Sequence, residues 1–288
     1  MVDEYDAHRL LASFLGTEGD DCAVIERDSK SLLLTTDMLH DTTDFPEGIR
    51  PYVVGWRSMA VSLSDVAAMG GDPVAAVLAL GVPEFDGDYV EEVARGARDV
   101  CGNCGAEYVG GDLDTHDETT TVSTVLGESS DPVRRSGASA GDLVCVTGEL
   151  GRTAVALRLF DEEEYGRANE LFAFEPRVGT GTKLSGYASS MMDISDGLAL
   201  SLHQMSRVSD VGFDIESSSL PAVEGAHGVE DTVFTGGDYE LVFTVPDENV
   251  DKLRDVVGDV GFTVVGESTE DGEVRIDGKE LDRRGYEH

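Results

Sequence analysis

A turn-rich segment in the middle of the chain limits the possible folds more than any other feature. Residues 128–142 read ESSDPVRRSGASAGD, which is rich in turn formers, and apolar runs continue on both sides of it. We therefore expect two domains of similar size, over residues 1–130 and 131–288. A chain of 288 residues is long enough for two modest domains that each bury a core.

Both halves mix helical and strand-like hydrophobic patterns, which predicts an α/β (α+β) protein. In the first half we expect strands at residues 22–27, 31–39, 73–83, 107–112 and 119–128, and helices at 5–15, 51–69 and 88–100. In the second half we expect strands at 142–148, 190–195, 213–218, 239–246 and 262–268, and helices at 152–160, twice within 165–188, at 198–209 and at 248–257.

The charge of the chain excludes several classes of partner. Its 58 Asp and Glu residues against 21 Lys and Arg give a net charge of −37, and the acid is spread along the whole chain. Such a surface repels phosphate backbones and anionic lipid, so we expect neither nucleic acid nor a membrane as a partner. Only four residues are lysine. Acid-rich, lysine-poor surfaces suit concentrated salt, which favours a halophilic cytosol over an ordinary acidic protein.

The lack of recognisable targeting signals and the small number of cysteines also favour the cytoplasm. No apolar run approaches the roughly 18 residues of a membrane span, and the opening MVDEYDAHRL has neither a basic region nor an apolar core. We therefore expect a cytoplasmic protein. Four cysteines, among them a single CxxC at Cys101 and Cys104, favour small reduced residues, with a four-cysteine zinc site as the alternative.

In the first half, carboxylates stand in apolar settings that do not suit a solvated surface. Asp21 directly precedes a strand, and Asp37 ends an apolar strand with Thr35 on the same face by the two-residue period. Asp65 continues a polar stripe of Ser58 and Ser62 along a helix made mostly of Ala, Val, Leu and Met. A carboxylate there is costly unless it is paired or binds a metal.

The second group of carboxylates lies next to glycines and strand ends. Asp112 follows two glycines, where the backbone can approach a phosphate. Asp193 and Asp196 lie where a strand gives way to a helix, a favourable place for anions, although Asp196 could instead be only the N-cap of that helix. Asp238 and Glu240 follow a Gly-Gly turn.

These residues together predict a magnesium-dependent phosphoryl transfer. Oxygen ligands without Cys or His favour hard cations, Mg²⁺ before Ca²⁺ or Zn²⁺. Clustered Mg²⁺ ions mostly hold polyphosphate, and the sequence has no GxxxxGK[ST] loop and no GxGxxG after a strand.

Eight segments in order make the chain resemble the thiamine-monophosphate kinase family of the aminoimidazole-ribonucleotide-synthetase-like superfamily. They are GDDCAVI, TTDML, SLSDVAAMGGDP, VGGD, RSGASAGDLVCVTG, DISDGL, GGDYELVFTVP and GYEH. The resemblance implies an N-terminal domain with a mixed or antiparallel sheet and helices that binds ATP and Mg²⁺, and a C-terminal α/β domain that completes the active site. It also implies ATP-dependent phosphorylation of thiamine phosphate to thiamine diphosphate with several Mg²⁺ ions, by a homodimer built on the N-terminal domains.

The resemblance also assigns roles to individual residues. It implies metal ligands at Asp21, Thr35, Thr36, Asp37, Asp65, Asp112, Asp193 and Asp196, with Asp37, Asp65 and Asp196 acting in catalysis. It implies ATP contacts at Gly111, Asp112, Arg135 and Ser195, and substrate contacts at Asp44, Gly237 and Tyr286. Asp44 stands where the family usually has His, Gly237 where it has Glu, and Ser62 where it has Asn.

Two alternatives remain. The first is another ATP-dependent member of the superfamily, such as a cyclising ligase, a selenophosphate synthetase or a hydrogenase-maturation protein. The last two usually need a terminal Cys or selenocysteine, whereas Cys22 lies inside GDDCAVI and the chain ends in GYEH. The second is a non-catalytic module that binds Mg²⁺ and nucleotide.

Overall fold

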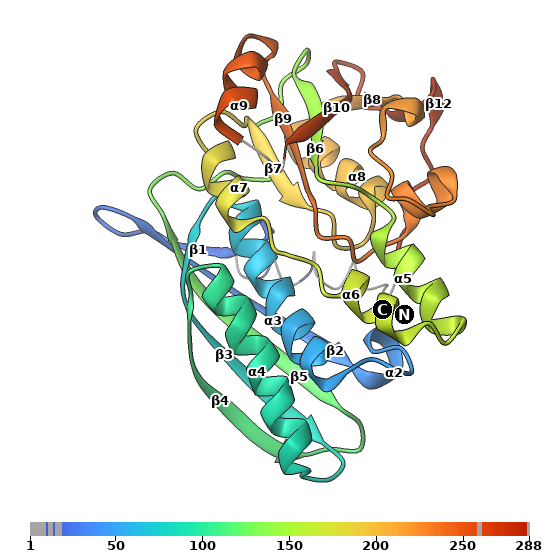
Figure 1. The fold of residues 1–288 in the computed structure, drawn as a ribbon. Helices are drawn as coiled ribbons and strands as arrows, with labels where there is room; N and C mark the ends of the chain where they lie inside the picture. The colour runs from blue at the N-terminus through green and yellow to red at the C-terminus, as the bar shows by residue number, and fades with distance from the viewer. Residues whose placement is uncertain (1–9, 11–13, 15–18, 258–260, 287–288) are drawn as a thin grey trace.

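The computed structural model describes residues 10, 14, 19–257 and 261–286, and these form two sheets in two lobes (Figure 1). The chain passes from the first sheet to the second through residues 130–142, where turn formers were expected to separate two domains. The helix expected at 5–15 lies outside the described residues apart from Leu10 and Phe14. Within the described part of the chain, no helix combines the length and apolar character needed to cross a bilayer.

The first sheet has five strands in the order β1-β2-β5-β3-β4. All neighbours pair antiparallel except β3 and β4, which are parallel, so the sheet is mixed, as the resemblance implied. Its strands are β1 (Ala23–Ile25), β2 (Ser31–His40), β3 (Asp72–Val82), β4 (Glu107–Thr115) and β5 (Thr120–Ser129).

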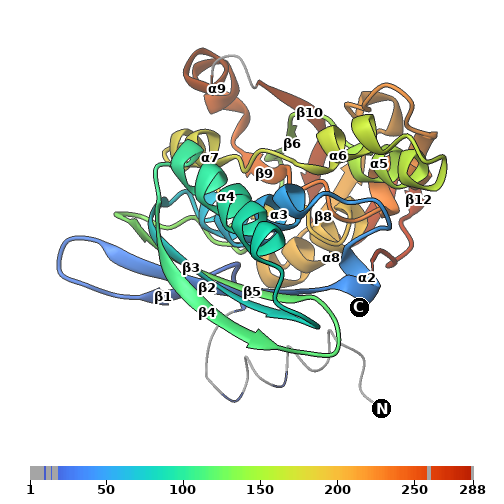
Figure 2. The same ribbon diagram turned by 60° about the horizontal axis from the view of Figure 1, so that its bottom comes forward.

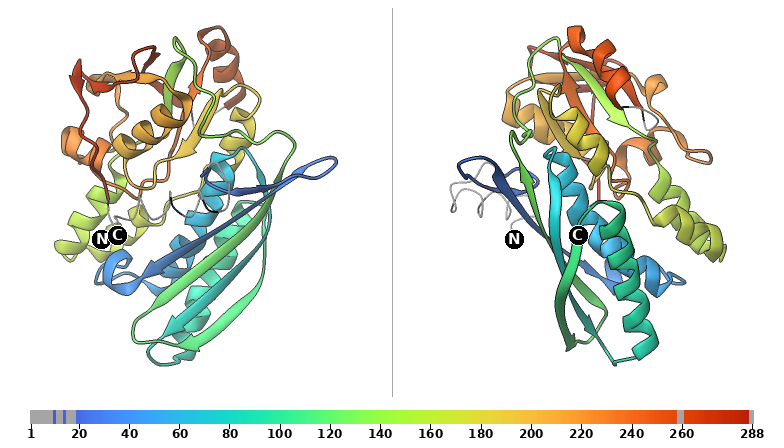
Figure 3. Two further views of the ribbon diagram at one scale, coloured as in Figure 1. Left: turned by 180° about the vertical axis from the view of Figure 1, so that it is seen from behind. Right: turned by 60° about the vertical axis from the view of Figure 1, so that its left-hand side comes forward.

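Helices α3 (Pro51–Ala68) and α4 (Gly87–Asn103) cover one face of this sheet (Figure 2). Proline at the first helical position starts α3 without loss of a hydrogen bond. The two helices pack closely because Gly55 and Gly96 lack side chains: a Cβ on Gly55 would lie 1.8 Å from the carbonyl oxygen of Val93. Helix α3 is almost completely buried, since the second lobe packs on its other side (Figure 3).

The opposite face of the first sheet carries no described helix and is apolar. Leu34 and Met38 on β2 and Val74 and Val77 on β3 are between 38% and 54% exposed. They lie on the strand face opposite to Leu33, which packs in the core under α3. Exposed apolar side chains grouped on one sheet face are typical of an interaction surface.

The second sheet has seven strands in the order β12-β11-β8-β10-β6-β9-β7. Its pairs are antiparallel except β11 with β8. The strands are β6 (Leu143–Thr147), β7 (Ser190–Asp193), β8 (Gly212–Ile215), β9 (Leu241–Val245), β10 (Phe262–Thr269), β11 (Val274–Ile276) and β12 (Lys279–Glu280).

The remaining helices belong mostly to the second lobe. They are α5 (Arg152–Asp161), α6 (Tyr165–Phe172), α7 (Val178–Leu184), α8 (Leu198–Ser209) and α9 (Val250–Val257). A short α2 (Asp41–Asp44) follows β2, and single turns form at η1 (Ser217–Ser219), η2 (Glu230–Phe234) and η3 (Asp247–Asn249). Helix α7 contacts α3, which joins the two lobes.

Candidate active site

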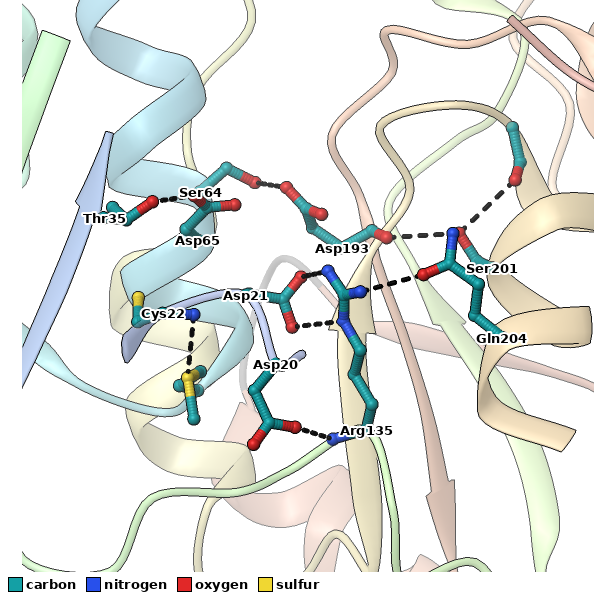
Figure 4. A network of polar contacts seen from close by, with 12 residues as sticks. Asp20, Asp21, Cys22, Thr35, Ser64, Asp65, Arg135, Asp193, Ser201 and Gln204 are labelled. Atoms are coloured by element: carbon teal, nitrogen blue, oxygen red, sulfur yellow. Dashed lines mark hydrogen bonds and ion pairs between the residues drawn. The ribbon is translucent and has the colours of Figure 1, made fainter. Parts of the chain in front are cut away.

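Three carboxylates meet where the two lobes join. Asp21, Asp65 and Asp193 each offer an oxygen within 4.8 Å of the other two (Figure 4). Asp21 lies two residues before the start of β1, Asp65 lies in the last turns of α3, and Asp193 ends β7. The fold thus assembles the acidic cluster, as we call Asp21, Asp65 and Asp193, from both halves of the chain.

Hydroxyl groups hold two members of the acidic cluster in place. Thr35 on β2 donates a hydrogen bond to Asp65, and Ser64 on α3 donates to Asp193 Oδ2 at 2.6 Å. Ser64 therefore links the two lobes directly at the cluster. Thr35, expected as a metal ligand, thus contacts Asp65, and its role as a ligand stays a prediction.

The polar stripe expected on α3 faces a matching polar stripe on the sheet. Ser58 hydrogen-bonds to Thr121, and Ser62 donates to Asp37 Oδ2. Asp37 therefore points to the same side of the sheet as the acidic cluster. The stripe explains why an otherwise apolar helix contains serines at these positions.

Burial and mutual repulsion make the charged forms of these carboxylates costly. Burial raises the pKa of Asp65 and Asp193 well above the ordinary value, and neighbouring carboxylates raise both further. Burial also raises the pKa of Asp37, against the hydrogen bond from Ser62. Groups that resist ionisation this strongly gain most from a bound cation.

The acidic cluster fits a hard divalent cation. It offers several carboxylate oxygens and no nitrogen or sulfur, which is the donor set that Mg²⁺ prefers. Among the described residues, no other group of three His, Cys, Asp or Glu side chains meets in this way. Asp21, Asp65 and Asp193 would hold the ion, with Asp37 beside them.

Arginines from the linker pair with the two acids that precede β1. Arg135 forms a fork with Asp21, with Nη2 2.8 Å from Oδ1 and Nε 3.2 Å from Oδ2. Its Nη1 also donates to Gln204 Oε1 on α8 at 2.8 Å. Arg134 pairs with Asp20 at 2.7 Å. The expected ATP contact Arg135 thus lies at the acidic cluster.

The loop between β7 and α8 carries Ser195 and Asp196, two and three residues after Asp193 of the acidic cluster. The N-cap of α8 is Gly197, with no side-chain cap hydrogen bond, so Asp196 is not the helix cap. The carbonyl of Asp196 accepts from the backbone N–H of Tyr286 at 3.0 Å. The alternative that gave Asp196 only a capping role is therefore wrong.

The three expected substrate residues gather around Arg57, a buried arginine on α3. Arg57 donates to the carbonyl of Gly237 at 3.3 Å and lies 3.8 Å above the ring of Phe172. Burial lowers the pKa of Arg57, while nearby Asp44 is among the groups that oppose this shift. Burial raises the pKa of Tyr286, and Asp44 raises it further.

Gly237 has no room for a side chain. Its φ is +92°, and a Cβ would lie 2.6 Å from Nη2 of Arg57. Glycine is therefore required at this turn. Tyr286 donates from its hydroxyl to the carbonyl of Thr43, next to Asp44, at 3.1 Å.

Three expected residues do not join the acidic cluster within one chain. Thr36 points to the exposed face of the first sheet, opposite to Asp37, and bonds to the carbonyl of Ser123. Gly111 and Asp112 lie on the exposed strand β4, and Asp112 pairs in register with Ala79. Their metal and ATP roles stay predictions.

Asp238 and Glu240 have structural roles rather than places in the acidic cluster. Asp238 accepts from the backbone N–H groups of Gly151 and Thr153 at the start of α5, and burial raises its pKa to about 6. Glu240 accepts from Arg152 at 2.9 Å and from Arg177 Nε at 2.7 Å. Both acids therefore serve to fix the second lobe.

Three residues of the site were not predicted from the sequence: Arg57, Ser64 and Gln204. Arg57 had a usable signal, because it is the only basic residue in a long apolar helix. Ser64 directly precedes Asp65, but its link to Asp193 depends on how the lobes dock. Gln204 carries no local signal on α8.

Comparison with known proteins shows which domain families the two lobes belong to. The model of the AIR synthase related protein N-terminal domain matches residues 19–129, and that of the C-terminal domain matches residues 139–279. Each lobe therefore has the AIR-synthase-related fold. Thiamine-monophosphate kinase of Halobacterium salinarum is 48% identical over 294 residues, covering 100% of both chains.

Solved structures agree with the sequence comparison. The structure of AaThiL complexed with AMPPCP and TMP has a TM-score of 0.91, is 31% identical, and covers 99% of this chain and 97% of its own. The HypE–HypF complex has a TM-score of 0.77 but is only 18% identical, which shows a common fold alone. The chain belongs to the thiamine-monophosphate kinase family.

Proposed function

We propose that the protein transfers the γ-phosphoryl group of ATP to the phosphate of thiamine phosphate and so forms thiamine diphosphate. The acidic cluster of Asp21, Asp65 and Asp193 is the observation that carries this proposal. Membership of the family supports it, as does AaThiL, which is complexed with AMPPCP, an ATP analogue, and with TMP.

The cofactor proposed for this reaction is Mg²⁺, with several ions bound. Asp21, Asp65 and Asp193 would hold them, with Asp37, Thr35 and Asp196 as further ligands. When bound, Mg²⁺ neutralises the facing phosphates and orients them for in-line attack. Thr36 and Asp112 are retained as proposed ligands on the basis of the resemblance alone.

The side chains of the protein contribute to the reaction mainly by positioning the nucleotide and thiamine phosphate. The acceptor is a phosphate oxygen that is already ionised at neutral pH, so the reaction needs no strong general base. Arg135 and Ser195 are proposed to contact the nucleotide beside the acidic cluster. Asp44, Gly237 and Tyr286 lie around Arg57 and are proposed to bind thiamine phosphate, with Gly237 acting through its backbone.

The proposal includes a homodimer built on the N-terminal domain, residues 1–130, with residues 131–288 completing the active site. The exposed apolar face of Leu34, Met38, Val74 and Val77 supports this assembly. Asp112 lies on the exposed strand β4 of the same sheet, so it would act at a site that a second copy completes.

Light scattering at micromolar concentration in molar KCl tests the dimer. We expect twice the chain mass of 30.7 kDa, and Met38→Asp should halve it by placing a charge on the apolar face. Thr42→Asp, the same charge change on an exposed position of α2, is the control. A wild-type particle of single-chain mass would exclude the dimer.

Turnover assays separate this function from its alternatives. With ATP, Mg²⁺ and thiamine phosphate in molar KCl, we expect ADP and thiamine diphosphate to accumulate together. A non-catalytic module would bind nucleotide without turnover, and another superfamily activity would not form thiamine diphosphate. The cytoplasmic location expected from the sequence suits a kinase that draws on ATP.

A further inference from the structure

Arg135 donates hydrogen bonds to both carboxylate oxygens of Asp21, a member of the acidic cluster. Its Nη2 lies 2.8 Å from Asp21 Oδ1 and its Nε donates to Oδ2 at 3.2 Å (Figure 4). The Asp21 side chain is only 1% exposed, whereas that of Arg135 is 21% exposed. Asp21 therefore faces a guanidinium on one side and the carboxylates of Asp65 and Asp193 on the other.

This contact works against a metal ion at the same carboxylate. A divalent cation bound by Asp21 would share its oxygens with the fork and lie close to a second positive charge. Bidentate arginine–carboxylate pairs are among the stronger charge-assisted contacts, so the competition is substantial. Arg135 thus offsets the repulsion within the acidic cluster as long as no metal is bound.

The side chain of Arg135 can leave Asp21 without unfolding the linker. Its own backbone N–H donates to Asp20 Oδ1 at 3.0 Å, and the neighbouring Arg134 pairs with Asp20 at 2.7 Å. These contacts anchor the backbone. The remaining side-chain partner of the Arg135 guanidinium is the neutral Gln204, at 2.8 Å, whose amide a water can satisfy.

We propose that Arg135 is an exchangeable counter-cation, which gives up Asp21 to a divalent cation and turns to a phosphate of the nucleotide when both ligands bind. This inference rests on the proposed function, because it needs a metal and a nucleotide at this site. It adds a role that a simple phosphate contact does not have: Arg135 weakens metal binding in the absence of nucleotide.

The exchange makes metal and nucleotide binding interdependent. Metal alone must displace Arg135 from Asp21 and leaves its charge unpaired, whereas nucleotide supplies a new anionic partner. Metal and nucleotide therefore bind with positive coupling, and linkage requires each to strengthen the other by the same factor. Removing Arg135 should reduce that coupling.

Metal binding measured without turnover tests the exchange. We would titrate Mn²⁺, a paramagnetic probe of Mg²⁺ sites, and follow free Mn²⁺ by electron paramagnetic resonance in molar KCl, with and without AMPPCP. Arg135→Gln should bind Mn²⁺ about threefold to tenfold more tightly than wild type without nucleotide. In the wild type, AMPPCP should tighten Mn²⁺ binding, and in Arg135→Gln this tightening should be about tenfold smaller. Tenfold is the factor expected for one charge-assisted hydrogen bond.

Arg134→Gln is the matched control, since it removes the same charge one residue away but leaves the Asp21 fork intact. Arg134→Gln should change neither the Mn²⁺ affinity without nucleotide nor its tightening by AMPPCP by more than about twofold. Arg135→Gln that binds Mn²⁺ as wild type does, or more weakly, overturns the exchange and leaves the proposed function standing. A wild type that binds no Mn²⁺ overturns both.

Folding of each variant is checked by its thermal unfolding midpoint. Should Arg135→Gln fail to fold, Arg135→Lys carries the test, because lysine keeps the charge but cannot form the fork. It should tighten Mn²⁺ binding in the same direction by a smaller factor. Unchanged or weaker Mn²⁺ binding by that variant would also refute the exchange.

Discussion

Replacing Asp65 with asparagine should stabilise the metal-free protein and at the same time remove its response to metal. The carboxylate oxygens of Asp65, Asp21 and Asp193 lie within 4.8 Å of one another. At that separation and an effective dielectric constant of about 20, two unit charges repel by about 3.5 kcal/mol. Asparagine relieves this repulsion with nearly the same shape.

Two effects reduce the gain. The charge-assisted hydrogen bond from Thr35 to Asp65 weakens, at a cost of about 1.5–3 kcal/mol. The raised pKa of Asp65 also lets the wild type escape part of the repulsion by taking up a proton. We therefore expect a net stabilisation of up to about 2 kcal/mol from the difference of these terms.

Thermal unfolding in molar KCl measures this balance. In chelator, Asp65→Asn should unfold up to roughly 5 °C above the wild type. Adding Mg²⁺ should raise the wild-type midpoint, because a ligand that binds only the folded state stabilises it, and should leave the variant nearly unchanged. Asp161→Asn makes the same substitution at an exposed position at the end of α5, outside the acidic cluster, and should behave as wild type.

Either of two results would contradict this expectation. If Asp65→Asn unfolds below the wild type in chelator, mutual repulsion does not dominate at this residue. If Mg²⁺ raises both midpoints equally, Asp65 is not a metal ligand.

Three further predictions follow from separate features. Glu240→Gln should lower the free energy of unfolding by about 3–5 kcal/mol in urea titrations, since it leaves Arg152 and Arg177 without their buried carboxylate; a loss below about 1 kcal/mol would contradict this. The unfolding midpoint should rise from dilute buffer to molar KCl, because salt screens the net charge of −37; a flat or falling midpoint would speak against a halophilic protein. Asp44→Ala should raise the KM for thiamine phosphate about tenfold to a hundredfold without changing that for ATP, as expected for one charge-assisted contact. Asp41→Ala on the same turn is its control, and equal KM values for wild type and Asp44→Ala would leave recognition to other groups.

Local patterns in the sequence predicted most of the regular elements. Helix α8 spans Leu198–Ser209, the range expected, and α3 ends one residue before its expected end. The strands that escaped prediction are β11 (Val274–Ile276) and β12 (Lys279–Glu280), which are short and lie at a sheet edge. Three and two residues are too few for a hydrophobic period to stand out.

The site was predictable in its parts but not in its assembly. The two-residue strand period correctly put Thr35 and Asp37 on one face, and the same period puts Thr36 on the other. Which carboxylates meet depends on how the lobes dock. No local pattern could therefore join Asp21 and Asp65 to Asp193, which lies in the other half of the chain.

The most direct test of the proposed kinase activity is the stoichiometry of its products. Chromatography should quantify ADP and thiamine diphosphate formed from ATP and thiamine phosphate in molar KCl with Mg²⁺. We predict one ADP for each thiamine diphosphate, no product in chelator, none from Asp65→Asn, and wild-type yields from Asp161→Asn. ATP consumption without thiamine diphosphate, or undiminished product from Asp65→Asn, would contradict the proposal that the acidic cluster supports this phosphoryl transfer.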